Sequence, residues 1–203
     1  MRLGLLAAAV LVLASATACG SDAPAALKGV VRTPALNVSS VSLPSAVDGS
    51  GPVTMKPSAN QLYLVYFGYT NCPDVCPTTL SDIRVALDDL PSDLAERVTV
   101  AMATVDPERD TAQTLTSYLG HFFDNGIPLR TTDTKVLDAA TEAFGVQYEL
   151  GEPEANGGYA VAHTAFTYVV DDTGTVVVEW PFGFESRSMT SDLRYLLDKK
   201  ESQ

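Results

Sequence analysis

The residues of this chain that are best suited to chemistry are two cysteines, Cys72 and Cys76, which lie four positions apart and are each followed by a proline. As a structural cross-link, such a pair would close almost no loop and would add little stability. A reversible disulfide would bring the two Cβ atoms to about 3.8 Å. One metal ion, bound through bonds of about 2.3 Å, needs a wider separation. The three intervening residues allow that separation, so the spacing leaves redox and metal chemistry both open.

A third metal ligand would have to be a histidine, and the chain has two, His121 and His163. Thiolates are soft ligands that select Cu(I), zinc or iron–sulfur clusters. Structural zinc takes four protein ligands and clusters usually take four cysteines, so two thiolates and one imidazole suit copper best. His121 follows Gly120 on an expected helix and is interpreted as a surface or capping residue. His163 follows a glycine-rich loop, and the residues alone leave a ligand and a structural role equally open.

The cysteines lie between an expected strand and an expected helix. Residues 62–67 are almost continuously apolar, which is typical of a strand buried on both faces. After the cysteines, apolar residues recur at helical spacing, and Pro77 fits the first turn of a helix, where its missing N–H costs nothing. We therefore expect the helix to begin at Cys76 or Pro77. The positive end of the helix dipole would then favour a thiolate at Cys76.

The rest of the chain alternates between strand and helix patterns. Apolar runs predict further strands at 98–105, 127–129, 165–170 and 175–180. A small hairpin is expected within 41–60. Helical periodicity predicts helices at about 115–122, 134–144 and 188–199, the first of them capped by Asp110. This order indicates the α/β class and a thioredoxin-like fold, with a central mixed sheet flanked by helices, an N-terminal extension and a C-terminal hairpin plus helix. Sites in such folds form at the carboxyl ends of strands, and Cys72 follows one such end.

The first residues are typical of an export signal. Arg2 is followed by an apolar run over 3–14, by small residues at 15–18 and then by Cys19. Small residues directly before a cysteine resemble the lipobox of bacterial lipoproteins, in which the cysteine carries lipid. The alternative is an ordinary secreted precursor that loses Cys19 with its signal. We predict three parts: a signal peptide over 1–18, a lipid-anchored flexible tether over 19–40, and the folded domain over 41–203.

The charge balance limits the choice of partners. The chain has 13 basic and 25 acidic residues and a net charge of −12. Nucleic acid binds basic surfaces, so it is excluded as a partner, and docking to anionic lipid through a basic face is disfavoured. Membrane contact is expected through the lipid on Cys19, which would hold the exported domain at the outer face of the bacterial cytoplasmic membrane.

Three separated segments of the chain resemble the signatures of the Sco/SenC family of copper proteins. They are residues 66–80, which contain both cysteines, residues 106–111 and residues 159–164. They occur in the order and spacing of that family. Three positions depart from its pattern: Asn71 stands where histidine is common, Ala162 where aspartate is common and Thr164 where serine is frequent. These changes remove an imidazole and a carboxylate from the surroundings of the expected ligands.

The resemblance implies a membrane-anchored protein of thioredoxin fold that binds copper, as Cu(I), Cu(II) or both, through Cys72, Cys76 and His163. It also implies an accessory acidic position at Asp106, for which stabilisation of the Asp-Pro turn is an equal alternative. The family serves the assembly of the binuclear copper centre of cytochrome c oxidase. The expected partners are therefore the copper-receiving subunit of the oxidase and other copper carriers.

Three functions remain open at this point. The first, which is not an enzymatic one, is a metallochaperone that delivers copper to the binuclear centre of the oxidase. The second is a thiol–disulfide oxidoreductase that keeps the copper-ligand cysteines of the oxidase reduced, which would need Cys72 and Cys76 but not His163. The third is a peroxide-reducing or redox-sensing protein, because thioredoxin-like folds also host that chemistry.

Overall fold

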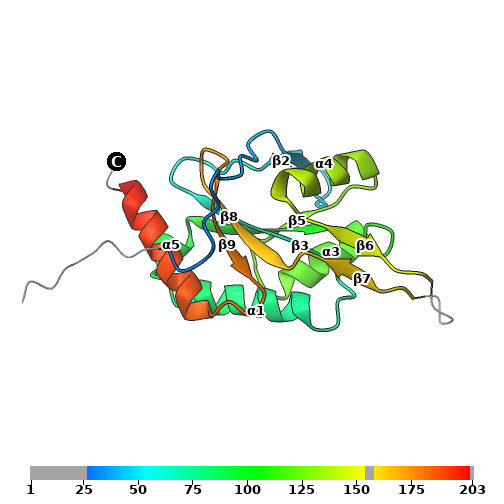
Figure 1. Ribbon diagram of the computed structural model, residues 1–203. Coiled ribbons are helices and arrows are strands. Elements are labelled where there is room, and N and C mark those ends of the chain that lie inside the picture. The colour runs from blue at the N-terminus through cyan, green and yellow to red at the C-terminus, as the bar shows by residue number, and fades with distance from the viewer. Residues whose placement is uncertain (1–26, 154–157, 202–203) are drawn as a thin grey trace, which may run out of the picture.

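The computed structural model describes residues 27–153 and 158–201, and it contains the predicted elements in their predicted order, together with one short helix and two short strands that were not predicted (Figure 1). The strands are β1 (Ser42–Pro44), β2 (Pro52–Thr54), β3 (Leu62–Gly68), β4 (Val98–Thr104), β5 (Ile127–Leu129), β6 (Tyr148–Leu150), β7 (Val161–His163), β8 (Phe166–Val170) and β9 (Val176–Pro181). The helices are α1 (Val75–Asp88), α2 (Ser92–Ala95), α3 (Ala112–Gly120), α4 (Thr134–Phe144) and α5 (Ser186–Glu201). In this part of the chain, no helix is both long and apolar enough to cross a membrane. The predicted signal peptide and Cys19 lie outside the described residues.

Five strands form the central mixed sheet, in the order β5-β4-β3-β8-β9. Strands β3, β4 and β5 run parallel, with Leu62 opposite Val98 and Gly68 opposite Thr104. Strands β8 and β9 complete the sheet in antiparallel pairings. Helices α1 and α4 cover opposite faces of the sheet (Figure 1). The predicted sheet flanked by helices is therefore confirmed, as is the small hairpin within 41–60, which forms as β1 and β2.

Strand β3 lies at the centre of the sheet because its side chains are apolar on both faces. All of its residues except Tyr63 are buried. The ring of Phe67 meets the ring of Phe144 from α4 edge-on, at 5.2 Å between centroids, and also meets Tyr168 from β8. The three rings also contact one another, and this cluster holds the carboxyl end of β3 firmly. The loop that carries Cys72 starts from this fixed point.

Helix α1 begins at Val75, one residue before the earlier of its two predicted starts, with Asp74 as N-cap. Pro77 is therefore its third residue and not its first. The position still costs no helical hydrogen bond, because the first such bond is donated by the amide of Thr78 to the carbonyl of Asp74, at 3.1 Å. Cys76 lies in the first turn, as the sequence predicts.

Asp110 does not cap α3, and that prediction is wrong. Thr111 is the N-cap, and its side chain accepts a hydrogen bond from the amide of Thr114 at 3.1 Å. The carboxylate of Asp110 is fully buried and accepts hydrogen bonds from the amide of Thr70, at 3.0 Å, and from the hydroxyl of Thr104, at 2.6 Å. Asp110 therefore joins the cysteine loop to the end of β4. Thr70 and Asp110 are 40 residues apart in the sequence. A helix cap, in contrast, connects residues only a few positions apart.

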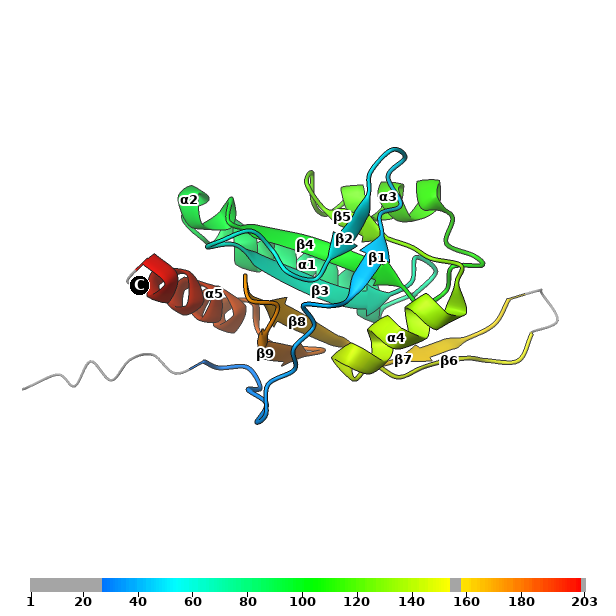
Figure 2. The same cartoon turned by 90° about the horizontal axis from the view of Figure 1, so that it is seen from above.

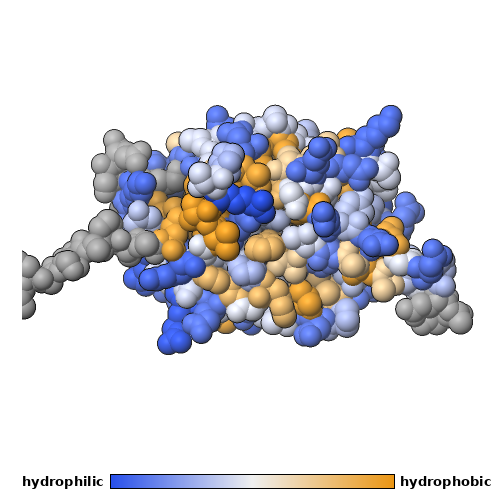
Figure 3. All heavy atoms as spheres, in the orientation of Figure 1, coloured by the Kyte–Doolittle hydropathy of each residue, from blue (hydrophilic) through white to orange (hydrophobic). Residues whose placement is uncertain are grey.

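The N-terminal segment is attached to the domain well before residue 41. The buried carboxylate of Asp192 on α5 accepts hydrogen bonds from the amides of Lys28, at 2.6 Å, and Gly29, at 3.0 Å. Val30 then pairs with Glu179 at the edge of β9 through two backbone hydrogen bonds of 2.9 Å. Apolar residues gather where this segment crosses the molecule (Figure 3). The described part of the predicted tether is thus a docked strap, which differs from the flexible segment expected over 19–40.

Strands β6 and β7 were not predicted. They pair antiparallel with Tyr148 opposite His163, and they form a sheet of their own. The two strands extend beyond the body of the domain, on the side away from the N-terminal segment (Figure 2). His163 is the last residue of β7, so this short hairpin positions the candidate ligand.

Candidate metal centre

The two cysteines meet where the loop after β3 enters α1. Cys72 lies in the loop and Cys76 in the first turn of the helix, and the amide of Cys76 points at the sulfur of Cys72 across 3.2 Å. Both thiols are free. Cys76 is fully buried, whereas Cys72 keeps 9% of its surface exposed. Cys76 is therefore fixed inside the protein, while Cys72 is nearly buried and retains a small exposed fraction.

Gly68, the last residue of β3, makes room for the inner sulfur. A Cβ at this position would lie 3.1 Å from the sulfur of Cys76 and 2.7 Å from a ring carbon of Tyr66. Real Cβ atoms do not approach a ring carbon so closely. A glycine here is therefore required by packing and not by an unusual backbone angle.

His163 supplies the third candidate ligand atom. Its Nε2 lies 3.5 Å from the sulfur of Cys76, and its Nδ1 lies 3.1 Å from the carbonyl of Thr164. Because a carbonyl can only accept, Nδ1 carries the proton of the neutral ring and Nε2 keeps a free electron pair directed at the sulfur. Tyr66 and Tyr69 meet the imidazole edge-on, with ring centroids 6.1 Å and 5.8 Å away. These contacts fix both the tautomer and the direction of the ring.

The structure thus brings together the three residues that the sequence singles out. The two sulfurs and one imidazole nitrogen of Cys72, Cys76 and His163 all lie within 4.8 Å of one another. Three ligands bound to one ion through bonds of about 2.3 Å would lie about 4 Å apart, so a small closure is enough. His121 does not join them, because it is exposed at the C-terminal end of α3 with Nδ1 on the carbonyl of Ser117. Its predicted capping role is confirmed.

Burial decides the protonation of the site. It raises the pKa of the Cys76 thiol to about 12, so the copper-free protein keeps this thiol protonated near neutral pH. The expected stabilisation of the thiolate by the helix dipole is outweighed, because desolvation of a buried charge is the larger effect. Burial also lowers the pKa of the His163 imidazole, which keeps that ring neutral and able to bind a metal.

Asp106 belongs to one of the three segments that resemble the Sco/SenC family. In the structure, however, it is not part of the cluster of Cys72, Cys76 and His163. Its buried carboxylate pairs with Arg109 and accepts a hydrogen bond from the hydroxyl of Tyr159. Its backbone amide donates to the hydroxyl of Thr104 at 3.0 Å. These contacts are structural, and those with Arg109 and Tyr159 reach the segment that leads into His163.

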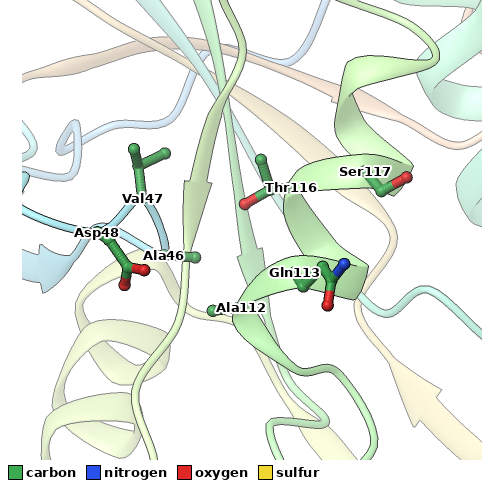
Figure 4. Close-up of a pocket in the computed structure, with 7 residues that line it drawn as sticks. All are labelled: Ala46, Val47, Asp48, Ala112, Gln113, Thr116 and Ser117. Atoms are coloured by element: carbon green, nitrogen blue, oxygen red, sulfur yellow. The ribbon is translucent and has the colours of Figure 1, made fainter.

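A cleft of about 360 Å³ opens beside the cluster and is lined by Tyr69, Cys72, Val161 and His163 among others. Cys76 does not line it, so the cleft exposes two of the three ligands. A hollow of similar size, about 390 Å³, lies between the β1–β2 connection and α3 (Figure 4). Its lining, from Ala46 to Ser117, contains no thiol or imidazole, so it does not provide comparable chemistry.

Comparison of the whole sequence with models of known protein families identifies the family of this chain. Residues 45–198 match the SCO1/SenC family model. The chain belongs to the SCO1/SenC family. It is 35% identical over 114 residues to an SCO2-like protein of Rickettsia prowazekii, a match that covers 56% of this chain and 55% of that protein. It is 33% identical over 122 residues to the mitochondrial SCO1 homologue of Homo sapiens, covering 60% of this chain and 40% of that protein. The chain thus spans less than two thirds of the length of these relatives.

Solved structures of Sco proteins share the fold. Apo Sco1 from Thermus thermophilus matches with a TM-score of 0.71 and 32% identity, covering 83% of this chain and 95% of that one. ScoI from Bradyrhizobium japonicum, which was solved with copper bound, matches with a TM-score of 0.65 and 30% identity. The match covers 76% of this chain and 95% of that one. The predicted thioredoxin-like fold is therefore confirmed. The departures Asn71 and Ala162 are both exposed, so they alter the surface around the cluster and leave its three ligands in place.

Proposed function

We propose that this chain binds one copper ion through Cys72, Cys76 and His163 and delivers it to the binuclear copper centre of cytochrome c oxidase. One observation carries the proposal: two sulfurs and one imidazole nitrogen from separate segments converge within 4.8 Å. Soft sulfur ligands with a single imidazole suit Cu(I). The copper-bound ScoI of Bradyrhizobium japonicum, at 30% identity, supports the choice of metal.

The protonation states follow from burial. Because Cys76 is protonated in the copper-free protein, copper must displace that proton, and metal binding releases acid. His163 binds through Nε2 and loses no proton, since its Nδ1 proton stays on the carbonyl of Thr164. The copper ion keeps its charge during transfer, and only its ligands change.

The cleft sets the order in which ligands are exchanged. Cys72 and His163 line it, while Cys76 lies behind them. A thiolate or imidazole of the receiving subunit therefore reaches the copper from the side of Cys72 and His163. In this scheme these two ligands are replaced first, and the buried Cys76 releases the ion last.

A thiol–disulfide oxidoreductase is the second candidate, and it is favoured by the contact between the two cysteines. Both are free, and the amide of Cys76 lies 3.2 Å from the sulfur of Cys72, so the loop can close to a disulfide. In this reaction two thiols give two electrons and two protons to a target disulfide and become a disulfide themselves. The imidazole of His163 has no part in that exchange.

Copper transfer to the soluble domain of the copper-receiving subunit separates the two functions. Protein loaded with copper is mixed with the reduced, copper-free domain, and formation of the binuclear centre is followed by its absorbance. We expect transfer from the wild-type chain and loss of transfer from His163→Ala. If His163→Ala supports assembly in cells as well as the wild type while Cys72→Ser does not, the oxidoreductase is the correct function.

We also propose that lipid on Cys19 anchors the protein to the outer face of the bacterial cytoplasmic membrane. The support is the run of small residues before Cys19 and the apolar segment over 3–14. Membrane fractionation of cells that express the wild type and Cys19→Ala tests this. Retention of Cys19→Ala in the membrane fraction, with the mass of an unlipidated chain, would rule the anchor out.

A further inference from the structure

We propose that Arg109 is a positioning residue that holds His163 against the two cysteines. The inference rests on the proposed function, because it assigns a role in the same copper site. Arg109 lies between β4 and α3 and is not among the candidate ligands. Its guanidinium, however, contacts both of the segments that carry them.

The first contact is with the segment that leads into β7. The guanidinium lies over the ring of Tyr159, with 3.7 Å between its central carbon and the ring centroid. One of its nitrogens donates to the backbone carbonyl of Tyr159 at 2.9 Å. The buried carboxylate of Asp106 pairs with Arg109 and also accepts from the hydroxyl of Tyr159. Tyr159 is therefore held at its ring face, its carbonyl and its hydroxyl, four residues before His163.

The second contact is with the cysteine loop. The same guanidinium lies 5.8 Å from the ring centroid of Tyr69, which precedes Cys72 by three residues. The ring of Tyr69 meets the imidazole of His163 at an angle of 88° and a distance of 5.8 Å. Arg109 thus packs between Tyr159, which precedes His163, and Tyr69, which precedes Cys72.

The topology leaves the orientation of the His163 side chain to contacts outside the central sheet. Strand β7 pairs with β6 in a separate two-stranded sheet and does not pair with the central sheet that leads to the cysteines. The hairpin also extends beyond the body of the domain (Figures 1 and 2). His163 is tethered to the central sheet only through residues 164–165, which lead into β8, and β7 itself has no backbone pairing with the cysteine loop. Side-chain contacts orient the imidazole relative to the cysteines, and the guanidinium of Arg109 contacts Tyr159 on the histidine side and Tyr69 on the cysteine side.

The planar guanidinium suits this role and an ammonium would not. A guanidinium can stack on an aromatic face while it donates in its own plane to a carbonyl and a carboxylate. Lysine offers a single point charge. Removing an arginine that orients a ligand from outside the metal site lowers metal affinity by about tenfold or more.

The test is a double-mutant cycle of Cu(I) affinity, measured by competition with a chromophoric chelator, on the wild type, Arg109→Gln, His163→Ala and the double variant. If Arg109 acts through His163, Arg109→Gln weakens binding by about tenfold in the wild type and has no further effect in His163→Ala. Arg32→Gln is the matched control, since Arg32 also pairs with a buried carboxylate, that of Glu179, at the far edge of β9. Arg32→Gln should leave copper affinity unchanged. An equal loss from Arg109→Gln in both backgrounds, or no loss at all, overturns the proposal.

A copper-free measurement distinguishes failure of this inference from failure of the proposed function. In the apo protein, nuclear Overhauser contacts between the rings of Tyr69 and His163 should be present in the wild type and in Arg32→Gln, and lost in Arg109→Gln. If these contacts persist in Arg109→Gln, the positioning role is wrong even if copper binds as proposed. If they are lost but the wild type binds no copper, the proposed function is wrong and the structural role of Arg109 stands.

Discussion

The Nε2 atom of His163 lies 3.5 Å from the sulfur of Cys76, although 87 residues separate them in the sequence. The two residues come from elements that share no backbone pairing, since His163 ends the β6–β7 hairpin and Cys76 lies in the first turn of α1. Their contact gives the cysteine pair a third candidate ligand atom. It also makes the site sensitive to anything that moves the hairpin relative to the helix.

Gly68→Ala should destabilise the protein at the base of the site. The new methyl group would lie 2.7 Å from a ring carbon of Tyr66 and 3.1 Å from the sulfur of Cys76. Overpacking of this kind costs about 1–3 kcal/mol. Chemical denaturation of the two proteins would measure the loss. Gly120→Ala is the control, because a Cβ there meets nothing within 4 Å and an alanine at the end of α3 should be neutral or stabilising. Equal stability of the two variants would contradict the account of Gly68.

Asp110→Ala should cost more than the loss of a helix cap. Its carboxylate is buried and accepts hydrogen bonds from Thr70 and Thr104, so truncation leaves buried donors without partners. We expect a loss of about 3 kcal/mol in the free energy of unfolding. Asp133→Ala provides the comparison, because Asp133 is the N-cap of α4 and its side chain accepts from the amide of Lys135. That variant should lose about 1 kcal/mol. A loss at Asp110 no larger than at Asp133 would restore the capping role.

The two thiols should differ in reactivity. In the reduced, copper-free protein, iodoacetamide should label Cys72, which borders the cleft, well before the buried Cys76. Only a thiolate reacts, and burial raises the pKa of Cys76 to about 12, so its labelling rate should keep rising with pH through the alkaline range. Peptide mapping by mass spectrometry after timed labelling measures both rates. In denaturant the two rates should become similar, and faster labelling of Cys76 in the folded protein would show that it is not buried.

The same pKa shift has a consequence for stability. The unfolded chain releases the Cys76 proton at a lower pH than the folded chain does, so between the two pKa values the folded state binds more protons. The free energy of unfolding should therefore fall as pH rises from the ordinary thiol pKa towards about 12. Cys76→Ser removes this part of the alkaline loss. A pH profile that is identical in the wild type and Cys76→Ser would contradict the burial of this thiol.

Local patterns predicted much of the fold. The apolar run that became β3, the helical spacing after Pro77 and the alternation of elements were enough to place Cys72 at the carboxyl end of a central strand. Strands β6 and β7 were missed because they are short and none of their residues is fully buried, so neither carries an apolar run. Asp110 was misread because the residues around it match a local cap, while its real partners lie in the β3–α1 loop and at the end of β4.

The candidate site was predictable as a set of residues but not as a geometry. The two cysteines and the resemblance of residues 159–164 to a known family pointed to Cys72, Cys76 and His163. No local sequence pattern shows that Arg109 contacts Tyr159 and Tyr69, because these residues are distant in the sequence. Arg109 and Tyr159, for example, are 50 residues apart. The effect of the helix dipole on Cys76 was also overestimated, because the depth of burial depends on the whole fold.

The most direct test of the copper site compares the Cu(I) affinity of His163→Ala with that of His121→Ala. Each variant removes one of the two histidines in the chain, but only His163 lies with the cysteines, while His121 is exposed at the end of α3. Competition with a chromophoric chelator under reducing conditions gives both affinities. The account predicts that His163→Ala binds more than about tenfold more weakly than the wild type, while His121→Ala is unchanged. Equal affinity of the wild type and His163→Ala would contradict it.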